Sequence, residues 1–258
     1  MGVIDQLRVA QAFDGAEGYA GHAHVQRRIA ADLAVKIAAL DLPETPRILE
    51  IGCGTGFLTQ ELLARGVDGE WLITDKAPAM VARCREAMGA APERRFALLD
   101  GEYGLGALDQ KFDLICASMA MQWFDDLPNT VSKLLQLLEP GGRLVFNTLA
   151  ADTFSEWHEA HRSIGRESGA LRFPELEEIK AQLNFRSTVS LNSQAYKERF
   201  SDARAFLKGL KAIGAATSRA GHAPLPPGDL RRVMQAFEAG GASVTYEVLT
   251  CHFRRDLA

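Results

Sequence analysis

A glycine-rich segment that runs from Glu50 to Gly56, Glu-Ile-Gly-Cys-Gly-Thr-Gly, has the clearest capacity for ligand chemistry in this sequence. Glycines let a backbone adopt positive φ and pass close to a ligand. A helix that begins behind the loop would add free N–H groups and partial positive charge. The segment therefore predicts a site for a nucleotide-like or amino-acid-like ligand at Gly52, Gly54 and Gly56. A tight strand-to-helix turn without a ligand is the simpler alternative.

The spacing of this loop distinguishes two classes of ligand. A dinucleotide requires Gly-x-Gly-x-x-Gly to seat its pyrophosphate, whereas here Gly-Cys-Gly-Thr-Gly is followed by Phe57-Leu58-Thr59. The Glu50 carboxylate would also repel a pyrophosphate, but it could serve an ammonium group directly or through water. The loop thus favours a ligand with a positively charged amino acid portion, and hydride transfer with NAD is disfavoured.

Two aspartates end the next two predicted strands. Asp75 lies about twenty residues beyond the loop, where doubly wound folds place a ribose-binding carboxylate. Asp75 could also cap the helix that follows it. Asp100 could accept a hydrogen bond from an exocyclic amine such as that of adenine, or it could be an ordinary turn residue before Gly101.

Strands and helices alternate through the middle of the chain and must position these side chains. This rhythm predicts a parallel sheet with right-handed crossovers, in which ligands bind beyond the carboxyl ends of the strands. The glycine loop, the two aspartates and the segment after Ala117 all fall at such ends. We expect strands at 47–51, 70–74, 95–99, 112–117 and 143–149, and helices at 57–64, 78–88 and 127–138.

The two ends of the chain predict additions to this sheet. Apolar residues at helical spacing, Ile29, Leu33, Ile37 and Leu40, indicate a helix in the first 40 residues. We expect one domain over 1–258 of α/β class, with a doubly wound, Rossmann-like sheet of seven mostly parallel strands and an antiparallel last strand. A helical lid at 1–40 and a helical capping insertion at 150–240 complete it. Beyond residue 150 the expected elements are helix over 152–183 with a break at Phe173-Pro174, a strand at 188–200, helices at 201–214 and 229–239, and the last strand at 243–250.

The composition excludes several classes of function. A net charge of −4 gives no reason to expect nucleic-acid binding, and no run of 18 apolar residues is present to cross a membrane. Four cysteines without a CxxC pair, and no apolar signal core, predict reduced thiols in a cytoplasmic protein. His158 and His161 lie three residues apart without a third ligand at a fitting spacing, so we expect no metal site.

From Glu50 to Phe146 the motifs resemble the class I methyltransferase family: the glycine loop, Asp75, Asp100, Phe-Asp-Leu-Ile at 112–115 and Leu-Glu-Pro-Gly-Gly-Arg-Leu-Val-Phe at 138–146 follow in its order. The resemblance implies S-adenosylmethionine as cofactor. A closer resemblance, to the malonyl-acyl-carrier-protein O-methyltransferases of biotin synthesis, lies in residues 16–27, 118–124, 148–149, 172–173 and 207–215. It implies methylation of the free malonyl carboxyl on acyl carrier protein or coenzyme A. Thr74 and Lys76 depart from the apolar residues expected beside Asp75.

The resemblance also assigns site residues. Tyr19, His22 and Gln26 share one helical face on a segment that closes over the cofactor in that family. Cofactor contacts are expected from Tyr19, His22, Gln26, Glu50, Gly52, Gly54, Gly56, Asp75, Lys76, Asp100, Gly101, Ser118 and Gln122.

An ionised malonyl carboxylate needs no general base, because carboxyl pKa values lie near ~4. It needs an Arg to hold it, for which Arg172 is favoured over Arg27, although either could be a surface ion-pair partner. Trp123 could wall the methyl pocket or be an ordinary core residue. We expect Tyr19, Arg172 and Trp123 to form the catalytic set.

A basic stretch suits an acidic carrier protein. Residues 186–232 hold nine Lys or Arg and three acids, a net charge of +6 against −10 in the rest of the chain. Arg204, Lys208 and Lys211 fall on one helical stripe and predict a docking face, although such a stripe is more often a solvated face. The alternatives are a methyltransferase for another small carboxylic acid or metabolite, and a cofactor-binding protein without catalysis.

Overall fold

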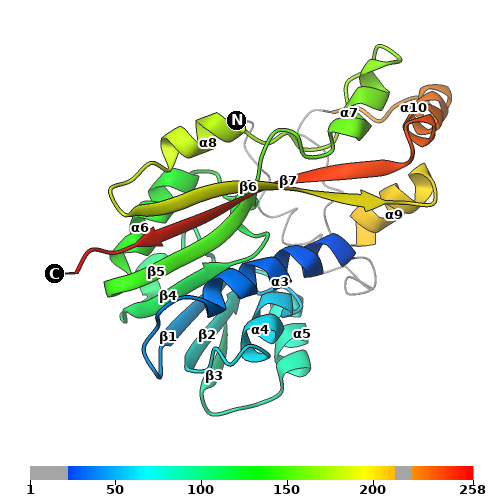
Figure 1. The fold of residues 1–258 in the computed structure, drawn as a ribbon. Coiled ribbons are helices and arrows are strands. Elements are labelled where there is room, and N and C mark those ends of the chain that lie inside the picture. The colour runs from blue at the N-terminus through cyan, green and yellow to red at the C-terminus, as the bar shows by residue number, and fades with distance from the viewer. Residues whose placement is uncertain (1–22, 213–221, 258) are drawn as a thin grey trace.

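The computed structural model describes residues 23–212 and 222–257, which form three layers with a seven-stranded sheet between two layers of helices (Figure 1). The strand order is β3-β2-β1-β4-β5-β7-β6. The strands are β1 (Arg47–Ile51), β2 (Glu70–Asp75), β3 (Arg94–Leu98), β4 (Phe112–Ala117), β5 (Leu138–Leu149), β6 (Thr188–Arg199) and β7 (Ser243–Arg254).

The sheet confirms the predicted fold class. Strands β1 to β5 pair in parallel, and β7 runs antiparallel to both of its neighbours, β5 and β6. The order reverses between β1 and β4, where one connection leads to β2 and the other to β5. In sheets of this kind the crevice at the reversal is the favoured place for a ligand.

Helices cover the two faces of the sheet separately (Figure 1). Side chains of α3, α4 and α5 pack on one face, and those of α6 and α8 pack on the other. The helices are α3 (His24–Ala38), α4 (Phe57–Leu63), α5 (Pro78–Met88), α6 (Leu127–Gln136), α7 (Ser155–Arg162), α8 (Leu176–Gln182), α9 (Ala203–Ala212) and α10 (Pro227–Ala239), with 3-10 turns η1 (Leu105–Ala107) and η2 (Met121–Trp123).

The central strands are buried on both faces, as their sequences predict. Leu114, Ile115, Cys116 and Ala117 of β4 are fully buried, because a parallel strand with helices on both sides requires an almost continuous apolar run. The outermost strand β6 is mostly exposed and polar. The reversal of strand order between β1 and β4 therefore lies among the most deeply buried strands of the sheet.

A second core, which we name the cap cluster, joins α7, α9 and α10 to the ends of β6 and β7. Its centre is fully buried Phe206, whose ring lies 5.2 Å from Trp157 and 5.4 Å from Phe237 between centroids. Val25 and Ile29 of α3 belong to the same cluster. The N-terminal helix and the region beyond residue 150 are therefore packed together at one end of the molecule.

The region 150–240 differs in part from the expectation. Residues 163–175, expected to be helical apart from a break at Phe173-Pro174, separate α7 from α8 and are not helical. Gly165 has a left-handed backbone with φ of +72°, a conformation that commonly ends a helix. The expected strand is confirmed as β6, so this region supplies an outer strand of the sheet as well as helices. No helix in 23–212 or 222–257 is both long and apolar enough to cross a membrane.

The helix α3 is fixed against the outer strand by a specific contact. The Tyr196 hydroxyl of β6 donates to Asp32 Oδ2 at 2.7 Å, and the Arg28 guanidinium lies 5.7 Å from the centre of the Tyr196 ring. Ile29, Leu33 and Ile37 face inward as their spacing predicts. This anchoring sets the position of Gln26 above the ends of the central strands.

Candidate functional site

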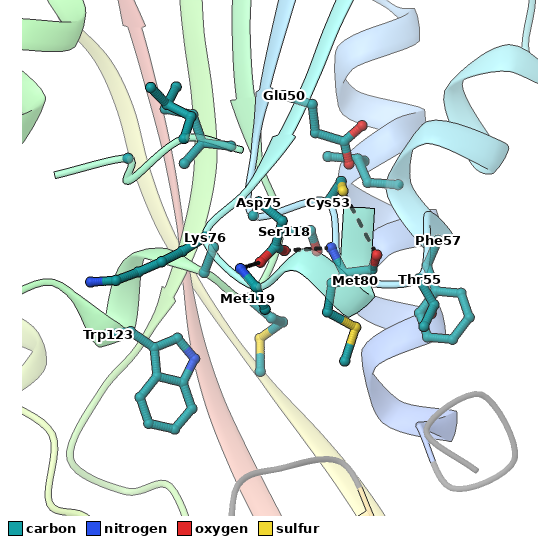
Figure 2. A pocket seen from close by; sticks show the side chains of 18 of the residues that line it. Glu50, Cys53, Thr55, Phe57, Asp75, Lys76, Met80, Ser118, Met119 and Trp123 are labelled. Carbon is teal, nitrogen blue, oxygen red and sulfur yellow. Dashed lines mark hydrogen bonds between the residues drawn. The ribbon is translucent and has the colours of Figure 1, made fainter. Parts of the chain in front are cut away.

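A pocket of about 970 Å³, its open mouth included, lies beyond the carboxyl ends of β1, β2, β3 and β4 (Figure 2). Its lining comes from α3, from the glycine loop, from the ends of β2 and β3, and from the segment after β4. The structure thus brings together ten residues predicted from the sequence: Gln26, Glu50, Gly52, Gly54, Asp75, Lys76, Asp100, Gly101, Ser118 and Trp123.

The three loop glycines have left-handed backbones and different surroundings. Gly52, Gly54 and Gly56 have φ of +69°, +53° and +90°. A Cβ on Gly52 would lie 2.4 Å from the Ala120 Cβ, so the loop packs against the segment after β4 only without a side chain. A Cβ on Gly54 would meet nothing within 4 Å and would project into open space. Gly54 therefore leaves room at the pocket surface for a ligand.

Asp75 holds the glycine loop in this shape. Its Oδ2 accepts a hydrogen bond from Gly54 N–H at 2.9 Å, and its Oδ1 accepts one from Ala77 N–H at 2.8 Å (Figure 2). One carboxylate thus joins the loop after β1 to Ala77, the residue directly before α5. The alternative role of Asp75 as N-cap is wrong, because Ala77 is the N-cap of α5 and no side chain caps this helix, but Asp75 does line the pocket.

Glu50 is buried at the base of the pocket, with 1% of its surface exposed. Burial, reinforced by the nearby Asp75 charge, raises the pKa of Glu50 to about 8, although a hydrogen bond donated by the Thr59 hydroxyl opposes the shift. A carboxyl group with this pKa is mostly neutral at pH 7 until a cation stabilises its ionised form. The pocket is therefore suited to a ligand that carries positive charge.

Lys76 and Asp100 form an ion pair across the pocket lining, with 2.7 Å between Lys76 Nζ and Asp100 Oδ2. Asp100 Oδ1 accepts hydrogen bonds from the backbone N–H groups of Glu102 and Tyr103. Partial burial works in the opposite direction, but Lys76 and these N–H groups hold the pKa of Asp100 below its usual value. This pair accounts for the lysine that follows Asp75 in place of an apolar residue.

Two buried polar atoms of residues in the lining lack a hydrogen-bond partner in the described part of the chain. Gln26 Oε1 and Thr55 Oγ1 accept or donate no hydrogen bond within the described part of the chain, and both residues line the pocket. Buried polar groups of proteins are normally satisfied. These atoms, the acids and the space at Gly54 fit S-adenosylmethionine, the cofactor that the sequence resemblance implies, because it combines a cationic amino acid portion with a ribose and an adenine.

Several residues of the lining were not predicted. Thr55 and Phe57 flank the last loop glycine, and Met80 and Leu99 extend the walls beside the two aspartates. Met119 projects into the pocket beside Trp123 (Figure 2). Thr55 and Phe57 could have been found from the loop itself, whereas Met80, Leu99 and Met119 carry no sequence signal other than their place after a strand or at the start of a helix.

Other predicted residues lie outside the lining. The Gln122 side chain is mostly buried, and its Nε2 donates to the Met119 carbonyl at 2.8 Å. A Cβ on Gly56 would lie 3.0 Å from Cys84 Sγ, within the helix layer. Arg172 is exposed, with Glu167 at 3.8 Å. Tyr19 and His22 fall outside the described residues.

The side chains of Arg204, Lys208 and Lys211 are exposed along α9, away from the pocket lining. Arg27, the alternative carboxylate-binding candidate, stacks its guanidinium 4.4 Å from the centre of the Phe57 ring. Across the described ranges, no group of three His, Cys, Asp or Glu is placed to hold a metal ion.

Comparisons with known proteins agree with this geometry. The family model described as a methyltransferase domain matches residues 22–201. A malonyl-[acyl-carrier protein] O-methyltransferase of Magnetococcus marinus is 36% identical over 96% of this chain and 92% of its own length. The biotin biosynthesis bifunctional protein BioCD of Bordetella avium is 41% identical over 96% of this chain, which spans 52% of that longer protein. A crystal structure of a putative methyltransferase from Bacillus halodurans has a TM-score of 0.60 at 14% identity, over 88% of this chain and 98% of that one, and shares the fold.

The space at Gly54 predicts a selective loss of ligand binding in Gly54→Ala. The new methyl group enters the pocket, so the dissociation constant for S-adenosylmethionine, measured by calorimetry, should rise roughly tenfold or more. Gly66→Ala is the matched control, because Gly66 also has positive φ and open space but lies outside the lining. Both variants should lose similar stability from backbone strain. Equal cofactor affinity in the two variants would contradict this assignment.

The raised pKa of Glu50 predicts an unusual dependence of stability on pH. The pKa of this carboxyl group is near its usual value of 4.5 in the unfolded chain and about 8 in the folded protein. The folded state therefore binds the extra proton between these values, and the free energy of unfolding falls as pH rises through that window. Glu50→Gln should remove this decline. At pH 8 its free energy of unfolding, measured by denaturant titration without cofactor, should exceed that of the wild type by roughly 3–5 kcal/mol. Parallel pH profiles of the two proteins would show that Glu50 is ionised when folded.

Proposed function

Because the chain belongs to the malonyl-[acyl-carrier protein] O-methyltransferase family, within the S-adenosylmethionine-dependent methyltransferases, we propose that it methylates the free carboxyl of a malonyl thioester early in biotin synthesis. The observation that carries this proposal is similarity along nearly the whole chain to a relative named for that reaction. The acid-lined pocket at the ends of the central strands supports it independently.

S-Adenosylmethionine supplies an activated methyl group when bound. We assign Asp75 to its ribose, Asp100 to its adenine, and Glu50 and Gln26 to its amino acid portion, with the backbone at Gly52 and Gly54 in close contact. Tyr19 and His22 remain proposed contacts from the segment before α3. The acids stabilise the cationic ligand, and the unpartnered Gln26 Oε1 gains a donor.

The transfer requires alignment more than acid–base chemistry. A malonyl carboxylate is ionised at neutral pH, because carboxyl pKa values lie near ~4, so its oxygen is already a nucleophile. Alignment of oxygen, methyl and sulfur and exclusion of water can supply roughly 7–11 kcal/mol. The described lining includes no His, and the pKa of the Cys53 thiol is raised by its hydrogen bond with Cys84 and by burial. The residues of the pocket are thus suited to positioning the reacting groups rather than to removing a proton.

Arg172 is our candidate for holding the second oxygen of the malonyl carboxylate, because a guanidinium binds carboxylates through paired hydrogen bonds. The neighbouring Phe173 packs on the cap cluster, as does Met119 of the pocket lining. Arg172 is therefore next in sequence to a residue of the cap cluster, which the pocket lining also contacts through Met119. We propose Trp123, a residue of the lining, as a wall of the methyl pocket.

The helix α9 is our candidate for carrier-protein docking. Phe206 and Leu210 are buried in the cap cluster, while Arg204, Lys208 and Lys211 are exposed on the other face of the helix. Such a basic stripe complements an acidic carrier protein and speeds its association. We propose further that residues 1–40 act as a lid, that 150–240 act as a cap within a single domain, and that the protein works in the cytoplasm.

The proposed function predicts that the purified protein converts labelled S-adenosylmethionine and a malonyl thioester into a methyl ester. In Arg172→Ala, kcat/KM for the thioester should fall roughly 100-fold, because a charge-assisted contact of about 3 kcal/mol is lost, while cofactor affinity is unchanged. Arg162→Ala, an exposed arginine of α7 paired with Glu159, is the control. Cofactor binding without any ester product would refute the function, and a fully active Arg172→Ala would refute only the role of Arg172.

The docking face predicts a difference between two forms of the substrate. Charge reversal in Lys208→Glu/Lys211→Glu should reduce kcat/KM for malonyl-acyl-carrier protein roughly tenfold or more at low salt, and should spare malonyl-coenzyme A. The control is Lys36→Glu/Lys133→Glu, which reverses two exposed lysines on α3 and α6 with the same change in net charge. Equal losses in the two double variants would place the docking surface elsewhere.

A further inference from the structure

Met119 has a strained backbone at the edge of the pocket. Its φ of +55° lies in the left-handed region, which residues other than glycine rarely adopt. Such strain persists only where surrounding structure imposes it, and it gathers at functional sites. Met119 both lines the pocket and packs on the cap cluster. Its conformation therefore sets the wall between the pocket and the cap.

Asn147 makes hydrogen bonds to Met119 and to its neighbour Ser118. The Met119 N–H donates to Asn147 Oδ1 at 2.6 Å, and Asn147 Nδ2 donates to Ser118 Oγ at 3.4 Å. Asn147 lies on β5, is 1% exposed and is absent from the pocket lining. On the opposite side Gln122 Nε2 donates to the Met119 carbonyl. The peptide groups on either side of the strained residue are thus both held by buried amides.

We propose that Asn147 is a positioning residue for methyl transfer, which holds Ser118 and Met119 so that Met119 and Trp123 form the wall against which the acceptor lies. This proposal rests on the proposed function and adds a residue to it. The two side chains extend to the same side of Asp75 in the pocket (Figure 2). Met119 also packs on the cap cluster, whereas the acids assigned to ribose and adenine lie at the ends of β2 and β3.

A purely structural role of Asn147 and a positioning role predict different effects of its loss. If the hydrogen bonds of Asn147 only stabilise the contact between β5 and the segment after β4, its loss lowers stability and leaves the kinetics of the folded enzyme unchanged. If it positions the acceptor wall, its loss also lowers the rate with bound substrates, because a displacement of about 1 Å can cost roughly 100-fold. Measurement of stability, cofactor affinity and steady-state rates on one set of variants separates these cases.

The central variant is Asn147→Leu, which is close in shape and removes both hydrogen bonds. We expect kcat for malonyl thioester methylation to fall roughly 30- to 100-fold, with the dissociation constant for S-adenosylhomocysteine within about threefold of the wild type. The matched control is Thr130→Val in α6, a fully buried hydroxyl that lies outside the lining and whose Oγ1 has no hydrogen-bond partner among the residues that the structure describes. It should leave kcat and cofactor affinity unchanged.

Two further variants keep the test decisive if Asn147→Leu folds poorly. Gln122→Met removes the other amide that holds Met119 and should give the same kinetic signature at smaller size. Met119→Gly tolerates the left-handed backbone without help, so the drop in Tm caused by Asn147→Leu should be smaller in that background than in the wild type. A drop of the same size in both backgrounds would show that Asn147 does not restrain Met119.

The outcomes distinguish this proposal from the function on which it rests. No methyl ester from the wild type, with normal S-adenosylhomocysteine binding, refutes the proposed function, whereas the Tm comparison still tests the restraint on Met119. Wild-type kcat in folded Asn147→Leu and Gln122→Met overturns the positioning role. Parallel losses of cofactor affinity and rate also overturn it, because the segment would then serve the cofactor instead of the acceptor.

Discussion

The pocket depends on one carboxylate with two backbone partners. Asp75 accepts from Gly54 N–H and from Ala77 N–H, and so joins the loop after β1 to the helix after β2. Without this bridge, three left-handed glycines in a row of five residues would have many alternative conformations. The side chain is thus part of the pocket and also the constraint that gives the pocket its shape.

A second constraint is the concentration of acid at this end of the sheet. Glu50, Asp75 and Asp100 line one cavity. They differ in the groups that stabilise the negative charge of each carboxylate. Asp100 has an ammonium partner in Lys76, and Asp75 has backbone N–H groups. Glu50 is fully buried with hydrogen bonds from the hydroxyl and backbone of Thr59, and its raised pKa of about 8 leaves it mostly neutral at pH 7. The least compensated acid is the one assigned to the cationic amino acid portion of the cofactor. Ligand charge and protein stability are therefore linked through Glu50.

Local patterns were sufficient to predict the sheet and ten of the residues that line the pocket. The strand ends, the glycine loop and the aspartates follow from apolar periodicity and from polar residues placed directly after strands. Residues 163–175 were misjudged because periodicity continues past Gly165, whose backbone geometry ends the helix. The contacts of Lys76 with Asp100 and of Met119 with Asn147 could not be predicted, since they join residues that are distant in sequence and depend on how neighbouring strands align.

The position of β7 between β5 and β6 makes assembly of the sheet order-dependent. The chain completes β6 before β7 exists, so β6 has no neighbour to pair with until residues 243–254 have left the ribosome. Until then β5 also presents an open edge, which is a hazard for aggregation. Strand β7 therefore completes one half of the sheet, because it pairs with both β5 and β6.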